Sequence, residues 1–448
     1  MQPDRLAEGG RIDRSRPLAF SFNGRALEGY VGDSLASALL ANGVSVVGRS
    51  FKYHRPRGIV GSGPEEPNAI VQIGIGAATT PNVRATELEL HDGLIASTVK
   101  GWPSLDFDLM AVTDWFHRLF VAGFYYKTFM RPRALWNFYE HLIRRTAGLG
   151  VAPELHDPDA YDHFNAHCDV LVAGAGPTGL MAALAAARCG ARVIVADERS
   201  ETGGSLLRET SSLDGAPASA WLEAVLEELS ESPDVTVLPR STVFGYYDQN
   251  FLTVLERCEK GSAQDGGESA ANIRQRLWRV RARRVVLATG ACERPLVFAN
   301  NDRPGIMLAS AVSEYIHRYA VRPGRRAVVF TNNDSGYRAA LDLVNAGADA
   351  MLVDSRSDGA GPVAEIAAGA GIEVRTGYAV SGVAGRKRVR LAEIVPASAN
   401  GGATHRRPER VACDLVAMAG GWSPVVHLHS QAGGRGTWDQ SSGCFVPG

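Results

Sequence analysis

Residues 169–190, with the sequence DVLVAGAGPTGLMAALAAARCG, constrain the possible folds of this chain most strongly. The apolar run Val170–Ala173 predicts a buried parallel strand, and an alanine-rich helix is predicted after the glycine-rich turn. Such a turn lets the backbone approach a pyrophosphate closely, and the start of the helix offers it free N–H groups and a positive dipole. This stretch therefore predicts a dinucleotide site built from Gly174, Gly176, Pro177, Thr178 and Gly179.

Two later stretches strengthen this prediction. A second strand, Arg192–Ala196, is expected to end at Asp197 and Glu198, 23 residues after the first glycine, where an acid can bind a ribose hydroxyl. A glycine doublet follows six residues after Asp197, and a buried strand that starts at Arg284 ends in small residues. We expect the cofactor to be lined by Gly203, Gly204, Ser205, Thr289 and Gly290.

A second strand–turn–helix unit is predicted downstream, with a strand at Ala327–Phe330 and a helix at Tyr337–Ala346. In its turn, Thr331 and Asn333 occupy the first two glycine positions, and their side chains should keep a pyrophosphate away. We expect the fold of a second nucleotide domain without bound NAD(P)H. The apolar stretch Asp414–Gly421 is expected to return to the first nucleotide domain as a buried strand.

The N-terminal residues predict a small β-grasp domain. Strands Leu18–Phe22 and Ala26–Tyr30 flank Asn23-Gly24, which favours a type I′ hairpin. A capped helix follows at Leu35–Ala41, and further strands are expected at Ala69–Ile75, Thr86–His91 and Ile95–Val99. A ferredoxin of this shape binds its cluster through four cysteines, but the first cysteine of the chain is Cys168. The sequence therefore excludes such a 2Fe–2S cluster in this domain.

Two segments of unusual composition leave their roles open. The stretch Arg49–Gly58 carries four permanent cations among aromatic residues and His54; it is either a solvated loop or a contact surface for an anionic cofactor or acidic partner. Residues 102–139 are rich in aromatic side chains and predict amphipathic helices broken at Arg131-Pro132. They either pack one domain against the next or dock another chain. The stretch Val151–His163 is expected to be a linker.

Composition narrows the class of protein. The chain of 448 residues is 45% hydrophobic and 21% charged, with a formal net charge of −1, so no basic field for nucleic acid is predicted. No apolar run predicts a membrane span, and the polar N-terminus lacks the pattern of a signal peptide. Six scattered cysteines favour reduced thiols in the cytoplasm over a disulfide framework or a metal site, and Cys292 is expected to be structural.

Long stretches of this sequence resemble the α subunit of heterotetrameric sarcosine oxidase. They are GDSLASALLANGV (32–44), GRSFKYHRPRG (48–58), EEPNA (65–69), GAGPTGL (174–180), DERSETGGSLL (197–207), ATGACERPLVF (288–298) and GGWSPVVHL (420–428). The resemblance implies an α/β fold with a cysteine-free ferredoxin-like domain and a two-dinucleotide module. The expected domains are 1–100, an aromatic-rich helical linker at 101–165, a dinucleotide-binding domain at 166–300 with 396–448, and a degenerate second nucleotide domain at 301–395.

The same resemblance implies the chemistry and the partners. NAD would bind at the Gly174 site, with Thr242 and Val243 meeting the adenine through backbone groups. FAD and FMN would lie on, or be shared with, a flavin-binding β subunit, and smaller subunits would complete the complex. The complex would demethylate sarcosine, and no catalytic residue is predicted on this chain. The chain stops before the family's C-terminal aminomethyltransferase-like domain, so we expect a fragment, a truncated gene product, or a protein whose remainder is encoded separately.

Two other functions remain open on the residues alone. The same motif fits FAD, so the chain could serve as an electron-transfer subunit of a related amino-acid or opine dehydrogenase. It could also be a truncated assembly subunit that binds no cofactor. The identity of a bound dinucleotide separates these possibilities.

Overall fold

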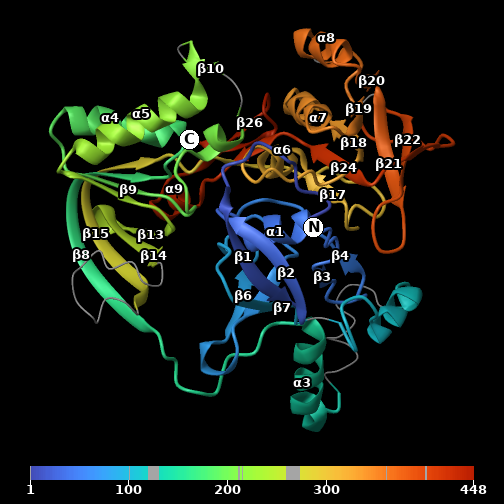
Figure 1. Ribbon diagram of the computed structural model, residues 1–448, viewed down its shortest axis with the longest axis horizontal. Helices are drawn as coiled ribbons and strands as arrows, with labels where there is room; N and C mark the ends of the chain where they lie inside the picture. The colour runs from blue at the N-terminus through green and yellow to red at the C-terminus, as the bar shows by residue number, and fades with distance from the viewer. Residues whose placement is uncertain are drawn as a thin grey trace. The chain divides into compact units, whose positions relative to one another are not determined.

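The computed structural model describes residues 2–99, 101–119, 131–209, 212–213, 215–258, 273–359, 361–398 and 401–448. The chain folds into two compact units (Figure 1). Unit 1 combines Met1–His156 with Pro295–Gly420, and unit 2 combines Asp157–Arg294 with Gly421–Gly448.

The N-terminal part of unit 1 is a β-grasp fold. Its elements are β1 (Asp13–Phe22), β2 (Arg25–Val31), α1 (Leu35–Ala41), β3 (Gly48–Arg49), β4 (Pro56–Arg57), β5 (Ile70–Ile73), η1 (Gly76–Ala78), β6 (Thr80–Arg84) and β7 (Leu94–Ser97). The five-stranded sheet has the order β2-β1-β7-β5-β6, in which β1 and β7 run parallel. The predicted β-grasp is thus confirmed.

Local sequence explains the first elements of this fold. Asn23 and Gly24 both adopt positive φ, at 49° and 77°, as the tight turn between β1 and β2 requires. Ser34 caps α1 by accepting the N–H of Ser37, whose hydroxyl in turn accepts the N–H of Ser34. The strand expected at Thr86–His91 is wrong, because the partner of β5 is the earlier segment β6.

The cations of the Arg49–Gly58 loop make contacts inside unit 1. The Arg49 guanidinium donates to the carbonyl oxygens of Leu105 and His54. Arg55 and Arg57 both pair with Asp302, at 3.2 and 2.8 Å. These contacts show how the loop is fixed within its own unit.

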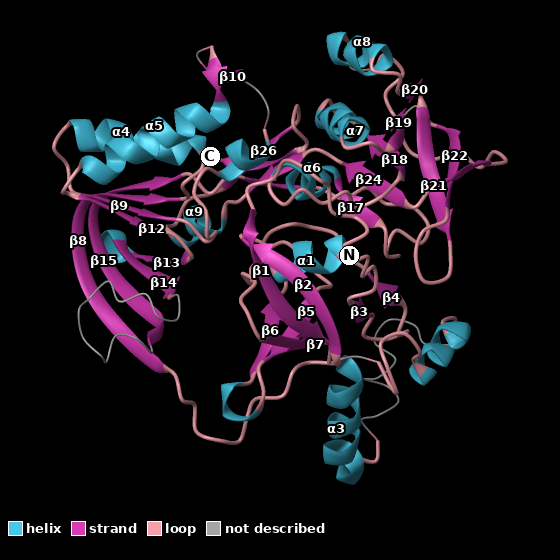
Figure 2. Cartoon of the chain, in the orientation of Figure 1, coloured by secondary structure: helices cyan, strands magenta, loops and turns pink. Residues whose placement is uncertain are grey.

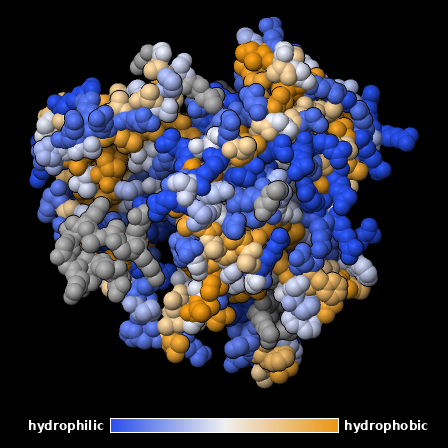
Figure 3. Space-filling model, in the orientation of Figure 1, coloured by the Kyte–Doolittle hydropathy of each residue, from blue (hydrophilic) through white to orange (hydrophobic). Residues whose placement is uncertain are grey.

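The aromatic-rich segment is partly helical, as expected. It contains η2 (Leu109–Phe116), η3 (Arg133–Leu135), which begins just after Pro132, and α3 (Trp136–Ala147); residues 120–130 lie outside the described part of the chain. Hydrophobic side chains appear on the surface over η2 and α3 (Figure 3), and Trp115 is 83% exposed.

Residues 295–420 form a parallel α/β layer and an antiparallel sheet. The elements are β17 (Ile306–Leu308), α6 (Ala309–His317), β18 (Arg326–Thr331), α7 (Ser335–Asn345), β19 (Asp349–Asp354), α8 (Pro362–Gly369), β20 (Glu373–Thr376), β21 (Tyr378–Ala384), β22 (Leu391–Pro396), β23 (Glu409–Ala412) and β24 (Leu415–Ala419). The five-stranded sheet has the order β17-β24-β18-β19-β20. The expectation that Asp414–Gly421 joins the first nucleotide domain is wrong, since β24 pairs with β17 and β18.

Unit 2 contains a six-stranded sheet of order β12-β9-β8-β15-β14-β13. Its strands are β8 (Ala160–Ala173), β9 (Val193–Ala196), β12 (Val235–Leu238), β13 (Ser241–Tyr247), β14 (Phe251–Arg257) and β15 (Ile273–Leu287). The remaining elements are α4 (Pro177–Arg188), η4 (Gly204–Arg208), β10 (Ser212–Leu213), β11 (Ala216–Pro217), α5 (Ala218–Glu231), η5 (Asp248–Asn250), β16 (Ala291–Glu293), β25 (Trp422–Pro424), α9 (His427–Gln431), β26 (Gly436–Asp439) and β27 (Cys444–Pro447).

Apolar clusters cover both faces of this sheet. Leu180 and Leu184 of α4 pack with Leu222 of α5 against Val172 and Val195. A separate cluster includes Leu252 and Val254 of β14 and Leu428 of α9. The long strands β8 and β15 stand out in Figure 2; β8 begins inside the stretch expected to be a linker, which is therefore corrected at its C-terminal end. Among the helices of the described residues, none has both the length and the apolar character needed to cross a membrane.

Candidate functional site

The turn between β8 and α4 has the tight geometry that its glycines predict. Gly174 adopts a φ of 103°, and a Cβ atom there would collide with the carbonyl oxygen of Ala288. A Cβ atom at Gly179 would collide with the carbonyl oxygen of Gly174. Both positions accept only glycine, because the backbone of one element touches the backbone of the next.

Gly176 differs from the other two glycines because it borders open space. Its φ of −74° suits any residue, and a Cβ atom there would approach only the Cα of Gly204, at 3.9 Å. Gly176 is the N-cap of α4, and no side chain of the described structure caps this helix. Pro177 lies in its first turn, followed by Thr178. Among the described residues, the first N–H groups of α4 therefore lack a side-chain acceptor, and such donors suit an anion.

The glycine doublet lies directly beside this helix start. Gly203 donates its N–H to the carbonyl of Ala175, at 2.9 Å. Gly203 and Gly204 have positive φ values, 127° and 55°, and Gly204 opens η4, which includes Ser205. A Cβ atom on Gly204 would lie 2.8 Å from the Cα of Gly176. The structure thus joins residues that are 28 positions apart in the sequence at the predicted phosphate position.

Asp197 connects the end of β9 to the same turn. One carboxylate oxygen accepts the N–H of Ala175 at 2.6 Å, and the other accepts the N–H of Arg199 at 2.9 Å. Each carboxylate oxygen has two lone pairs, so both can still accept a ribose hydroxyl. Glu198 follows, and its carbonyl oxygen accepts a bond from Arg257 at 2.7 Å.

The remaining predicted residues lie at the borders of this site. Ala288 donates its N–H to Ala173, which places Thr289 and Gly290 beside the start of the turn. The Thr289 hydroxyl donates to the carbonyl of Val425, at 2.8 Å. Ser241 donates its N–H to the carbonyl of Asp197, at 2.6 Å, so β13 begins next to the ribose acid. Thr242 and Val243 follow in that strand, paired with Leu255 and Val254.

Sequence reasoning missed two groups in this unit. Arg294 donates to the carbonyl oxygens of Gly443 and Ser442, at 2.6 and 3.1 Å, and so ties two distant loops together. The guanidinium of Arg208, at the end of η4, lies 5.2 Å from the ring centre of Trp422. No local sequence pattern predicts either contact, because the two partners of each contact lie far apart in the sequence.

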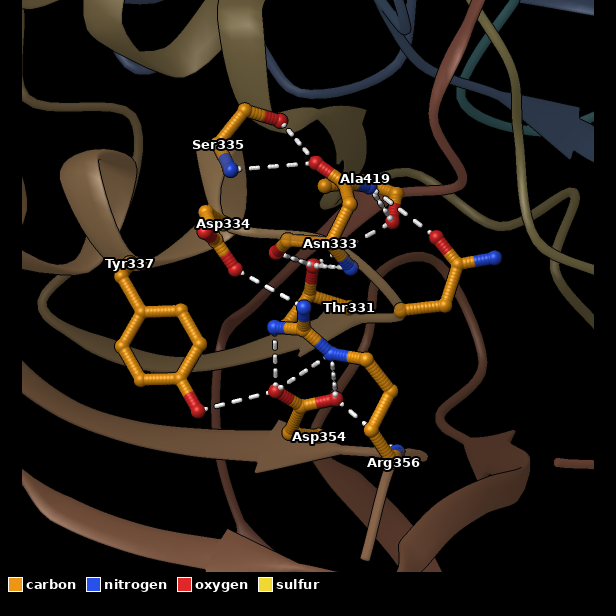
Figure 4. Close-up of polar contacts among 9 residues, drawn as sticks. Thr331, Asn333, Asp334, Ser335, Tyr337, Asp354, Arg356 and Ala419 are labelled. Carbon is orange, nitrogen blue, oxygen red and sulfur yellow. Dashed lines mark hydrogen bonds and ion pairs between the residues drawn. The ribbon is translucent and has the colours of Figure 1, made fainter. Parts of the chain in front are cut away.

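The corresponding turn of unit 1, between β18 and α7, is filled by its own side chains (Figure 4). The Thr331 hydroxyl donates to the carbonyl of Asn333 at 2.6 Å. The Asn333 amide donates to the carbonyl of Ala419, and its oxygen accepts the N–H of Ser335 at 3.0 Å. The N–H of Ser335, at the start of α7, thus has an acceptor in the side chain of Asn333 from the preceding loop.

Asp354, the acid at the end of β19, also has partners within the protein. Asp354 is fully buried and accepts the Tyr337 hydroxyl at 2.9 Å (Figure 4). Arg356 pairs with Asp354 and, through another nitrogen, with Asp334, each at 2.8 Å. A ribose would have to displace these groups. The contrast with Asp197 supports the expectation that this second turn holds no NAD(P)H.

Comparison with protein families agrees with this architecture. Residues 168–439, more than half of the chain, match the model of the pyridine nucleotide-disulphide oxidoreductase family. The chain belongs to that family. Residues 15–101 match the model of a 2Fe-2S iron-sulfur cluster binding domain. The predicted fold class, a ferredoxin-like domain before a two-dinucleotide module, is confirmed.

Individual relatives confirm the resemblance found in the sequence. The chain is 47% identical over its whole length to the alpha subunit of sarcosine oxidase from Rhizobium meliloti (strain 1021), and covers 44% of that protein. It therefore spans about half the length of such relatives. An opine oxidase subunit from Agrobacterium tumefaciens (strain Ach5) is 32% identical over 41% of this chain and 36% of its own length.

The fold is also similar to that of a solved structure over the full chain. L-proline dehydrogenase from P. horikoshii aligns with a TM-score of 0.62 and 19% identity, covering all of this chain and 68% of the other. At this identity the likeness shows the fold alone.

The residues at the 2Fe–2S match do not fit a cluster. Residues 15–101 contain no cysteine, and such clusters need four thiolate ligands. The loop before β5 instead surrounds the buried carboxylate of Glu66, which accepts backbone N–H groups. They belong to Val60, Gly61, Asn68 and Ala69, at 2.7 to 3.0 Å. Oriented N–H groups of this kind can bind an anion. In this loop the acceptor is the carboxylate of the protein's own Glu66.

Proposed function

We propose that unit 2 binds NAD and that the chain is the dinucleotide-binding subunit of an amine-oxidising complex of the sarcosine oxidase type. The observation that carries the binding site is the uncapped start of α4 at Gly176, which lies next to Gly204 and follows Ala175, whose N–H donates to the acid Asp197. This arrangement fits a pyrophosphate and its adjoining ribose. A bound dinucleotide supplies a two-electron carrier.

The residues of this chain would bind and orient that carrier. N–H groups at Gly176, Thr178 and Gly179 would face the pyrophosphate, Asp197 with Glu198 would take the ribose, and Thr289-Gly290 would border the rest. Gly203 and Gly204 allow the close approach, because a side chain at Gly204 would press on the opposite backbone. The amine-oxidising residues would belong to a flavin-binding partner.

The proposed overall reaction converts sarcosine, oxygen and water to glycine, formaldehyde and hydrogen peroxide. The 47% identity to the alpha subunit of sarcosine oxidase supports it. The name of that relative also supports assembly with other subunits, which we propose to include a flavin-binding subunit carrying FAD and FMN and smaller subunits. The reaction would take place in the cytoplasm.

A second candidate is an FAD-binding subunit of an opine-oxidising enzyme. It is favoured by the 32% identity of 190 residues to an opine oxidase subunit, and the glycine-rich turn accepts either dinucleotide. Denaturing the purified protein and identifying the released cofactor by absorbance and mass spectrometry separates the two candidates. NAD supports the first and FAD the second, whereas a folded protein that releases neither contradicts both.

A further inference from the structure

Strand β15 carries arginines at alternate positions on one side. Arg279, Arg281 and Arg283 are exposed, whereas Val280 and Ala282 between them are buried. Side chains alternate between the two faces of a strand, so the three arginines point the same way, about 6.7 Å apart. The strand therefore presents a row of three cations on one face of the sheet.

The neighbouring strand β8 adds polar and titratable groups beside this row. Asn165 pairs with Arg279 and His167 with Arg281 in the parallel ladder, and His163 lies two residues before Asn165. All three are exposed. We name these six residues the arginine face; they are Arg279, Arg281, Arg283, His163, Asn165 and His167.

The arginine face lacks the acids that neutralise arginines elsewhere in the unit. Within the described part of the chain, none of its three guanidinium groups forms an ion pair with a carboxylate. Among the described residues, the Arg281 guanidinium donates to the carbonyl oxygens of Asp248 and Gln249 and lies over the Phe251 ring, 5.0 Å from its centre. Asp169, whose pKa is lowered mainly by its bond to Arg192 and slightly by Arg283, is already paired with Arg192 at 3.1 Å.

The opposite side of β15 shows the contrast. There Arg276 pairs with Glu256 at 3.4 Å, and Trp278 donates to the same carboxylate at 2.7 Å. The whole chain has nearly equal numbers of acids and bases. A row of like charges without counter-charges repels itself, and an oppositely charged partner relieves that repulsion.

The same region of the sheet has an open edge. Residues Ala160–Cys168 of β8 pair with β15 on one side, whereas β9 pairs with β8 only from Val170 onward. Among the described residues, no strand lies on the other side of this segment. Such an edge presents backbone donors and acceptors to an added strand.

We propose that the arginine face and the adjoining edge of β8 dock an extended acidic segment of a protein partner. Carboxylates at alternate positions of a strand repeat at about the same 6.7 Å spacing as the arginines. A polypeptide strand also supplies donors and acceptors that alternate at the spacing of the β8 edge, which nucleic acids and lipid headgroups do not. The proposal does not depend on a dinucleotide at Gly174.

Fluorescence anisotropy with labelled ten-residue peptides tests this proposal on the full chain. An alternating Thr-Glu peptide is compared with a block peptide of five threonines and five glutamates, and with a ten-nucleotide oligothymidylate. The alternating peptide is expected to bind about tenfold more tightly than the block peptide. The two peptides carry the same charge and differ only in the order of their residues, so such an advantage would come from the spacing of the carboxylates. Binding should weaken as salt rises.

Variants show where the peptide binds. The double variant Arg279→Glu with Arg281→Glu is expected to lose at least about tenfold in affinity. The matched control, Arg16→Glu with Arg25→Glu, changes the same net charge at exposed positions of β1 and β2 and should bind like the parent. Equal binding of the two peptides, tighter binding of oligothymidylate, equal loss in the control, or no binding would each overturn the proposal. Released dinucleotide, measured on the same samples, tests the proposed function separately.

Discussion

Replacing Glu66 with glutamine probes how the ferredoxin-like domain keeps its loop without a cluster. The Glu66 side chain is buried, and each carboxylate oxygen accepts two backbone N–H groups at 2.7 to 3.0 Å. A glutamine amide has one oxygen, so its NH2 group would face two N–H donors. A buried donor left without an acceptor costs about 1–3 kcal/mol.

Two backbone N–H groups would lose their acceptor in the variant, but the variant also no longer buries a charged carboxylate, which offsets part of that cost. The expected loss in the free energy of unfolding is therefore about 2–4 kcal/mol. Burial raises the pKa of Glu66 above its ordinary 4.5, although the N–H groups oppose this shift. A raised pKa in the folded state means that the wild type loses stability as pH rises from 4.5 through the shifted value. The glutamine variant lacks this dependence, so the gap between them should be widest below pH 4.5 and should narrow as pH rises.

Glu65→Gln is the matched control for this experiment. Glu65 accepts the N–H groups of Ser62 and Gly63, both at 3.1 Å and both through one oxygen, and its side chain is exposed. The glutamine oxygen can keep both bonds, so a loss below about 1 kcal/mol is expected. Urea unfolding of the two variants measures the difference. An equal or smaller loss for Glu66→Gln would refute the reasoning.

Further predictions concern buried thiols and the second turn. Burial raises the pKa of Cys168 to about 11 and that of Cys413 to about 12. Iodoacetamide at pH 8 should therefore leave both thiols unmodified in the native protein and modify the exposed Cys189, which mass spectrometry can verify. Rapid labelling of Cys168 or Cys413 would contradict this. Tyr337→Phe removes a hydroxyl bonded to the buried Asp354 and should lower the free energy of unfolding by about 2 kcal/mol. An unchanged urea midpoint would disprove that role.

Local patterns predicted the elements whose geometry is set by neighbouring residues. The Asn23-Gly24 turn, the capped helix α1 and the strand–turn–helix unit at Gly174 all depend on contacts within a few residues. The roles of Thr331 and Asn333 were predictable for the same reason, because they occupy glycine positions in a recognisable turn.

Long-range pairing was harder to predict. The strand Leu415–Ala419 is apolar throughout and would suit either parallel sheet, so its pairing with β17 and β18 is decided by packing. The long strand β15 was recognised only near its apolar end, because its arginines hide the strand pattern. A strand was expected at Thr86–His91, but the segment that pairs with β5 is the earlier strand β6.

The candidate site shows the same division. The sequence motifs predicted Gly174, Gly176 and Asp197, but the closeness of Gly204 to Gly176 is visible only in three dimensions. Contacts such as Arg294 with Gly443 span about 150 residues of sequence and follow no local pattern. Sequence therefore indicated the parts of the site, and the fold determined which of them meet.

Calorimetric titration of NAD into the cofactor-free chain and two variants tests the central claim most directly. A Cβ atom at Gly176 would approach only the Cα of Gly204, at 3.9 Å, so Gly176→Val is expected to fold and to block a pyrophosphate at the start of α4. Thr331→Val replaces a hydroxyl that donates to the Asn333 carbonyl in the filled turn of unit 1, and so also alters a helix-start turn. We predict that Gly176→Val lowers NAD affinity at least about a hundredfold while Thr331→Val leaves it unchanged. Unchanged affinity in Gly176→Val, or equal loss in both variants, would contradict the proposed site.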